Sequence, residues 1–199
     1  MKFHRILPGI TVLLLLVVTA CSKTPYTGRE RLLLLSEGQE LSMGAQSFKS
    51  LMKTNEKKIN HDPAINEHVR RVGERIARAS GKKYKWEFVV IQDDKTPNAF
   101  VLPGGKVFVY TGLLPITLNE HGLAAVLGHE VAHAIARHGG ERVSQQVLVS
   151  TSMLAVSFAL SKSESRTSQM TMAALGAGVS VGLILPFSRL HESEADRLG

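Results

Sequence analysis

The 199-residue sequence contains one cysteine, Cys21, so it cannot form an intramolecular disulfide bond. It also lacks a dense run of lysine and arginine, although its formal net charge is +7. Proteins that bind nucleic acids concentrate basic charge in a patch or stripe, so we expect no nucleic-acid partner. A hydrophobic content of 44% with 21% charged residues excludes an intrinsically disordered chain and indicates a folded domain.

Long apolar runs are also missing. The longest are residues 10–18, 147–160 and 172–187, and each is shorter than the roughly 20 apolar residues that span a bilayer. We expect the last two to form buried or groove-lining helices. One alternative is that these segments make partial contact with a membrane. Another is that they are the transmembrane spans of an integral membrane protein.

The N-terminus has the pattern of an exported protein. Residues 1–20 resemble a secretory signal peptide, with basic residues before a short apolar run and small residues after it. Residues 18–21, VTAC, resemble a bacterial lipobox, in which Cys21 is lipidated; a free cysteine is the alternative. By analogy with bacterial sorting, Ser22 favours the outer membrane. We therefore expect a periplasmic protein that a lipid anchors to a membrane surface.

Residues 21–36 contain proline, glycine and several charges, and we expect a lipidated tether that leads into a domain over 37–199. Apolar residues at three- to four-residue spacing predict helices over 37–53, from 63 to about 80, and over 120–138. Residues 84–92 are rich in aromatic and β-branched residues and predict a strand. Two apolar runs around Pro103-Gly104-Gly105 predict a hairpin. Together these patterns predict a mainly helical α+β fold with a small, partly antiparallel sheet.

The motif HExxH occurs at His129, Glu130 and His133. Positions four apart on a helix lie only about 40° apart around the axis, so both imidazoles can reach one metal ion. Zinc favours such nitrogen ligands, and Glu130 on the flank can take a proton from the water that the metal activates. His138 lies on the opposite face of a regular helix, so we expect a structural or hydrogen-bonding role. His121 is expected near the cap or in solvent.

Two histidines leave a catalytic zinc ion one protein ligand short, and the segment HESEADRLG some sixty residues later can supply it. Glu192 and Glu194 are both candidates and are hard to separate by spacing alone, while His191 is a weaker one. Asp196 lies four residues after Glu192 on the same helical face. It can accept a hydrogen bond from a ligand imidazole and thereby fix its tautomer.

HExxH followed by Glu-x-x-Ala-Asp resembles the HtpX-like and Ste-type zinc metallopeptidases. The segments TPNAFVLPGGKVFVYTGLL and LAAVLGHEVAHAIARHGGER are similar to its periplasmic, Oma-like branch, which includes lipoprotein proteases. The resemblance implies a zincin-like domain with one zinc ion, held by His129, His133 and Glu192. It also implies that Asp196 forms a hydrogen bond with one of these ligands. Because relatives continue with further helices, we expect a metallopeptidase domain over 37–199 that is truncated at its C-terminus; a naturally short domain is the alternative.

The function that follows is zinc-dependent endopeptidase activity, with Glu130 as general base. The resemblance implies that Asn98 and Ala99 lie near the cleft, where substrate can pair in extended form; an ordinary hairpin strand is the alternative. We expect unfolded or misassembled envelope polypeptides as substrates, and the outer-membrane assembly machinery as a possible partner. The alternative is a metal-binding periplasmic chaperone or adaptor that cuts little.

Overall fold

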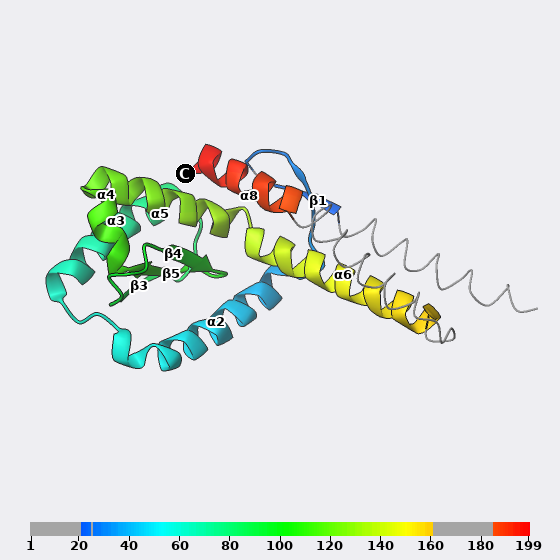
Figure 1. The fold of residues 1–199 in the computed structure, drawn as a ribbon. Coiled ribbons are helices and arrows are strands. Elements are labelled where there is room, and N and C mark those ends of the chain that lie inside the picture. The colour runs from blue at the N-terminus through cyan, green and yellow to red at the C-terminus, as the bar shows by residue number, and fades with distance from the viewer. Residues whose placement is uncertain (1–20, 25, 161–184) are drawn as a thin grey trace, which may run out of the picture.

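The computed structural model of the chain describes residues 21–24, 26–160 and 185–199 (Figure 1). Helices dominate and flank a small sheet, so the predicted mainly helical α+β fold is confirmed. In chain order the described elements are β1 (Cys21–Lys23), β2 (Glu30–Leu32), α2 (Glu37–Thr54), the 3-10 helix η2 (Glu56–Lys58), α3 (Pro63–Ala79), β3 (Glu87–Ile91), β4 (Ala99–Leu102), β5 (Lys106–Tyr110), the 3-10 helix η3 (Thr111–Leu113), α4 (Leu114–Thr117), α5 (Glu120–Ile135), α6 (His138–Leu160) and α8 (Leu185–Leu198). The predicted signal peptide and most of segment 172–187 lie outside the described residues.

The main sheet has the strand order β3-β5-β4. β3 pairs with β5 in parallel, whereas β4 and β5 form the predicted antiparallel hairpin, with Ala99 opposite Val109. Gly104 and Gly105 turn the chain with φ angles of 86° and 82°, a region that favours glycine. The predicted small, partly antiparallel sheet is therefore confirmed, and β4 is one of its edges.

The hydrophobic core lies between this sheet and the helices α3 and α5. Val69 of α3, Val107 of β5, and Leu123 and Leu127 of α5 are all fully buried in it. Burying one such side chain stabilises the fold by about 1.5–3 kcal/mol. This packing anchors α5, the helix that carries the HExxH motif.

Side-chain caps fix where the helices begin. Ser36 forms a capping box with Gln39 at the start of α2. Asp62 accepts hydrogen bonds from the backbone of the first turn of α3, and Asn119 does the same for α5. These caps satisfy backbone N–H groups that have no partner within the helix. The predicted helices near 37–53 and 63–80 are thereby confirmed.

The prediction of one helix over 120–138 is wrong at its C-terminal end. α5 ends at Ile135, Arg137 adopts a φ of 61°, and α6 begins at His138. The turn brings Arg137 within 2.7 Å of the buried carboxylate of Glu40 on α2, and a charge buried there requires such a partner. As a consequence, His138 leaves the helix axis of α5, and helical spacing no longer describes its position relative to His129.

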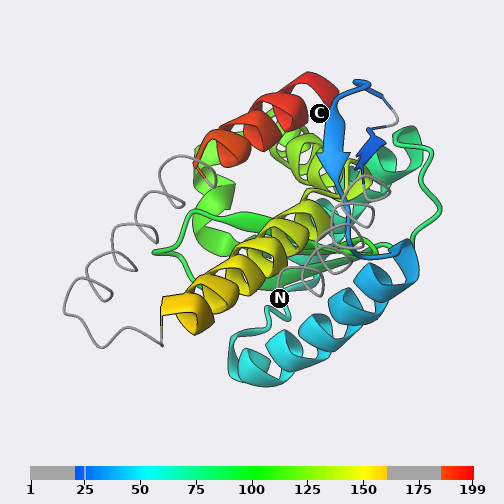
Figure 2. The same cartoon turned by 90° about the vertical axis from the view of Figure 1, so that its right-hand side faces the viewer.

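Residues 21–36 do not form the simple tether that we expected. β1 and β2 form a two-stranded antiparallel sheet, and Arg31 is buried. Arg29 forms ion pairs with Glu141 of α6 and Glu194 of α8, so the segment is fastened to both helices. Figure 2 shows the two strands beside α8. The ion pairs of Arg29 with the buried carboxylates of Glu141 and Glu194 thus attach residues 21–36 to the domain.

The apolar segment 147–160 forms the C-terminal part of α6, which extends away from the sheet in Figure 1. Its Val147, Leu148 and Leu154 are exposed by 47%, 40% and 71%, so the expectation of a buried helix fails at these residues. Within the described ranges, none of the helices has both the length and the apolar content that crossing a bilayer would require.

Candidate metal centre

Helices α5 and α8 bring the three predicted metal ligands together. The Nε2 atoms of His129 and His133 are 3.0 Å apart, and Glu192 Oε2 lies 3.1 Å from the first and 3.4 Å from the second. Each residue thus offers one ligand atom, and the three atoms lie within 4.8 Å of one another. Two imidazole nitrogens and one carboxylate oxygen form the donor set that zinc takes in catalytic sites.

Close backbone contact allows α8 to approach α5. A Cβ atom added to Gly128 would lie 2.9 Å from the carbonyl oxygen of Gly199. The glycine before His129 therefore leaves room for the neighbouring helix. Without this approach Glu192 could not reach the histidines.

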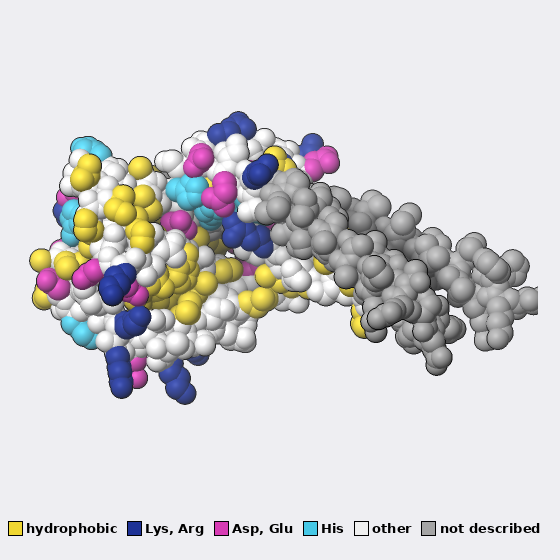
Figure 3. Space-filling model, in the orientation of Figure 1, with side chains coloured by type: hydrophobic (Ala, Val, Ile, Leu, Met, Phe, Trp, Pro, Cys, Tyr) yellow, Lys and Arg dark blue, Asp and Glu magenta, His cyan; other side chains and the backbone are white. Residues whose placement is uncertain are grey.

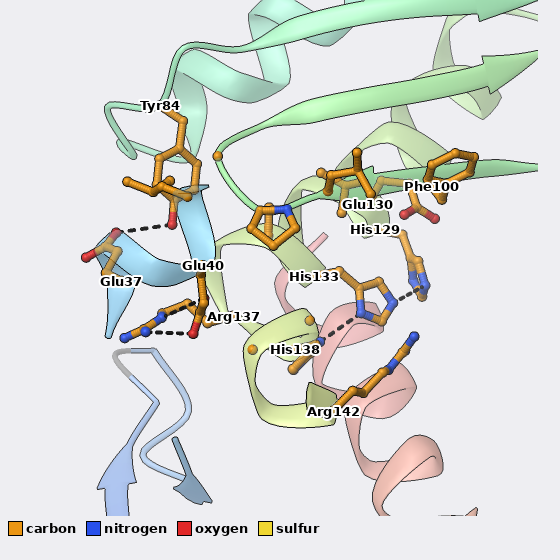
Figure 4. Close-up of a pocket in the computed structure, with 18 of the residues that line it drawn as sticks. Glu37, Glu40, Tyr84, Phe100, His129, Glu130, His133, Arg137, His138 and Arg142 are labelled. Carbon is orange, nitrogen blue, oxygen red and sulfur yellow. Dashed lines mark hydrogen bonds and ion pairs between the residues drawn. The ribbon is translucent and has the colours of Figure 1, made fainter. Parts of the chain in front are cut away.

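The second ring nitrogen of each histidine also has a partner. His129 Nδ1 lies 2.9 Å from Asp196 Oδ1, the contact that the spacing of Glu192 and Asp196 suggests. His133 Nδ1 lies 2.8 Å from Nδ1 of His138, and Figure 4 shows His133 between His129 and His138. Both Nε2 atoms are consequently free to face the position that a metal would occupy.

Glu130 lies on the other side of His129, close to β4 and the ring of Phe100 (Figure 4). Burial raises the pKa of Glu130 to about 7, although the neighbouring His129 acts in the opposite direction. Burial also lowers the pKa of His133 to about 4, so its ring is neutral at physiological pH. A neutral imidazole has the lone pair that a metal requires.

A cavity of about 230 Å³ opens beside the three ligands. Its lining includes β4, the HExxH residues, Arg142 and Glu192, and it continues to Tyr84 and the N-terminal part of α2. Figure 3 shows histidine and acidic side chains together on this face, next to a hollow bordered by apolar side chains. The site is therefore open to a ligand as large as a peptide side chain.

The two residues expected near the cleft differ in position. Ala99 lines the cavity, whereas Asn98 is exposed and does not belong to the lining. The carbonyl oxygen of Asn98 accepts a hydrogen bond from the backbone N–H of Tyr110, at 3.0 Å. Ala99 thus borders the cavity, whereas Asn98 uses its backbone carbonyl in the sheet, and substrate binding at either residue stays a prediction.

The other candidate residues do not join the ligand cluster. Glu194 and His191 are buried on the far side of α8, where Glu194 pairs with Arg29 and His191 Nε2 lies 3.0 Å from Glu141. His121 is exposed near the capped start of α5, as expected.

The sequence analysis did not identify two residues that contact the candidate site and its surroundings. Arg142 approaches Glu192 Oε1 to 3.2 Å, and Arg29 reaches α8 from the N-terminal segment. Arg142 follows the break between α5 and α6, and Arg29 lies more than 160 residues before its partner. Neither position carries a helical or motif signal, so only the folded structure identifies them.

A helix with HExxH facing a second helix with a carboxylate ligand defines a metallopeptidase. Comparison with known proteins agrees, since the model of Peptidase family M48 matches residues 63–199. The chain therefore belongs to Peptidase family M48, which implies a bound metal. The broad metallopeptidase prediction is confirmed, and the narrower HtpX-like and Ste-type assignment stays a prediction.

Individual relatives come from mitochondria and from bacteria. The chain is 40% identical over 177 residues to the mitochondrial metalloendopeptidase OMA1 of Schizosaccharomyces pombe. The aligned region covers 88% of this chain and 50% of that protein. It is 30% identical over 169 residues to the beta-barrel assembly-enhancing proteases of Yersinia pestis and Escherichia coli, covering 83% of this chain and 34% of theirs. The chain thus spans half or less of the length of these relatives.

Proposed function

We propose that this chain is a zinc-dependent endopeptidase with one zinc ion held by His129, His133 and Glu192. The observation that carries the proposal is the convergence of two Nε2 atoms and one carboxylate oxygen from two helices. In this arrangement the ligands leave room for water and substrate on the cavity side. A bound zinc ion supplies Lewis acidity, which polarises a scissile carbonyl group and makes water a stronger nucleophile.

Glu130 is the general base of the proposed reaction. It precedes Val131 on the helix that carries both histidines, and it lines the cavity next to β4. Its carboxylate accepts a proton from the attacking water and delivers it to the nitrogen of the leaving amine. The peptide bond is thereby hydrolysed to a carboxylate and an amine.

The edge of β4 that has no strand partner in the described sheet is the proposed binding site for the substrate backbone. Asn98 bonds to Tyr110, and hydrogen-bonded positions alternate along an antiparallel pair, so Ala99 and Val101 direct their backbone groups away from β5. These two residues line the cavity beside Glu130. An extended polypeptide can add to this edge through main-chain hydrogen bonds, which demand little of its side chains.

Tolerance of many side chains suits a protease for unfolded or misassembled cell-envelope polypeptides, and we propose these as substrates. The bacterial relatives are beta-barrel assembly-enhancing proteases, which supports a role in the cell envelope and contact with the outer-membrane assembly machinery. The lipobox-like segment ending at Cys21 supports a periplasmic, lipid-anchored location. The mitochondrial relatives support the same chemistry in a different membrane system.

Cleavage of casein by the purified full chain, with products identified by mass spectrometry, tests this function. We expect internal cuts by the wild type and none by Glu130→Gln, with zinc content equal in both proteins. Equal cleavage by the variant would remove Glu130 as the base. If the wild type binds zinc and protects clients from aggregation without cutting them, the chaperone alternative replaces the protease.

A further inference from the structure

The two histidines of the metal centre are supported in different ways. His129 directs Nδ1 to a carboxylate, Asp196, at 2.9 Å. His133 instead directs Nδ1 to Nδ1 of another histidine, His138, at 2.8 Å. Two ring nitrogens at this distance share one proton, so one donates and the other accepts.

A buried carboxylate decides which nitrogen donates. His138 Nε2 lies 3.1 Å from Glu194 Oε2, and both side chains are almost fully buried, with 1% and 4% exposure. A carboxylate oxygen accepts, so His138 Nε2–H donates to Glu194. The Nδ1 atom of a neutral His138 is then an acceptor, and His133 Nδ1–H must be the donor. The remaining nitrogen of His133, Nε2, therefore carries a lone pair that points towards Glu192.

Arg29 holds this carboxylate in position. Its Nε donates to Glu194 Oε2 at 2.7 Å, and its two Nη atoms form a fork on Glu141 of α6, at 2.9 and 2.7 Å. Thr27, from the same N-terminal segment, donates its hydroxyl to the other oxygen of Glu194. Bidentate contacts of arginine with carboxylates are among the stronger and more directional hydrogen bonds in proteins.

The surroundings leave little freedom to these groups. The ring of His191 stacks on His138 with centroids 4.4 Å apart, and Glu141 and His191 are fully buried. The other charged group on the N-terminal segment that faces the cluster is Arg31, which donates to the backbone oxygen of Ala136. His138 is thus held between His133 of α5 and the pair Glu194 and His191 of α8, and only 1% of it is exposed.

We propose that Glu194 and His138 form a hydrogen-bonded relay that keeps His133 protonated on Nδ1 and free on Nε2 for the metal, with Arg29 fixing Glu194. All three are positioning residues, because they act on the metal through His133. The inference rests on the zinc site of the proposed function. It gives the N-terminal segment a part in building the metal centre, and it gives His133 a counterpart of the support that Asp196 provides to His129.

The test measures zinc affinity of the full chain by competition with a chromophoric chelator. We expect His138→Phe and Glu194→Met to bind zinc about 10- to 100-fold more weakly than the wild type, the usual loss when the partner of a ligand histidine is removed. Glu194→Gln is the conservative variant. Its amide oxygen can accept from His138 and Arg29 while its amide nitrogen donates to Thr27, so we expect an affinity closer to that of the wild type.

Glu141→Met is the matched control, because it also removes one buried carboxylate from Arg29 but does not reach His138. A purely structural role predicts equal losses of zinc affinity in Glu141→Met and Glu194→Met. The relay predicts a larger loss in Glu194→Met, even where the melting temperatures of the zinc-free proteins are equally lowered. Equal losses, or wild-type affinity in His138→Phe, would overturn the relay.

A second readout needs neither zinc nor activity. Nitrogen-15 NMR of the imidazole rings in the zinc-free protein reports which nitrogen of His133 is protonated. We expect Nδ1–H in the wild type and in Glu194→Gln, and a shift towards Nε2–H in Glu194→Met; unchanged tautomers overturn the proposal. If the wild type binds no zinc, both the relay and the proposed function are wrong. If the wild type binds zinc tightly and no relay variant weakens that binding, only the relay is wrong.

Discussion

His129 Nδ1 lies 2.9 Å from Asp196 Oδ1, although the two residues are 67 positions apart in the chain. The contact orients the imidazole so that its Nε2 faces His133 and Glu192. It also joins the two helices at the metal centre, because Asp196 lies on α8 and His129 on α5.

Removal of this carboxylate should weaken metal binding. We expect Asp196→Ala to lower zinc affinity by about 10- to 100-fold, because His129 loses the acceptor that fixes its tautomer. Ser193→Ala, at an exposed position of the same helix, should bind zinc as the wild type does. Chelator competition measures both. Unchanged affinity in Asp196→Ala would mean that packing alone orients His129.

Loss of the third ligand should be more severe. We expect Glu192→Ala to be purified with little or no zinc, since two histidines alone leave the ion without its carboxylate ligand. Elemental analysis after dialysis measures the metal content, and Glu130→Gln, which leaves all three ligands in place, is the control. Full zinc occupancy in Glu192→Ala would assign the third ligand to a different residue.

The edge of β4 offers a test of substrate binding. Proline at position 99 removes one N–H that points away from β5, and a single hydrogen bond contributes about 0.5–1.5 kcal/mol. We therefore expect Ala99→Pro to lower kcat/KM for casein peptides by about three- to tenfold with zinc content unchanged. Ala99→Ser keeps the N–H and should retain wild-type kinetics. Equal rates for all three proteins would place the substrate elsewhere in the cavity.

Acid should weaken the attachment of the N-terminal segment. Burial alone would raise the pKa of Glu141, but hydrogen bonds and charges from Arg29 and His191 outweigh it and lower the pKa to about 2. A carboxylate with a lowered pKa stabilises the folded state above its ordinary value of 4.5 and loses that contribution as the pH falls from about 5 towards 2. The contribution is roughly 3 kcal/mol as an order of magnitude.

Urea unfolding of the zinc-free protein between pH 7 and pH 3 measures this dependence. The wild type should lose stability as the pH falls, and Glu141→Gln should be less stable at pH 7 but flatter across the range. Parallel curves for the two proteins would show that Glu141 is not the titrating group. Glu67→Gln, on the exposed surface of α3, is the control for a carboxylate with little burial.

Much of the fold could be read from local patterns. The hairpin between β4 and β5 follows from two apolar runs around Pro103-Gly104-Gly105, and the start of α3 follows from Asp62 before a proline. The break after Ile135 could not be read, because the segment AIARH has good helical propensity. It is decided by the distant Glu40, which pairs with Arg137.

The same division holds for the candidate site. Helical spacing alone makes His129 and His133 neighbours, and four-residue spacing places Glu192 and Asp196 on one face of α8. Spacing did not separate Glu192 from Glu194. The structure directs Glu192 towards His129 and His133, and Glu194 towards Arg29 and His138. The role of residues 21–36 was also missed, because an ion pair across more than a hundred residues leaves no trace in local composition.

The sequence by itself determined that His129 and His133 share one face, since the period of an α-helix brings residues four positions apart onto the same side. Only the tertiary structure decided which residues contact the second ring nitrogen of each histidine. Buried charges must find partners wherever the chain can supply them, and this requirement brings Arg29 to Glu141 and Glu194, and His138 between Glu194 and His133.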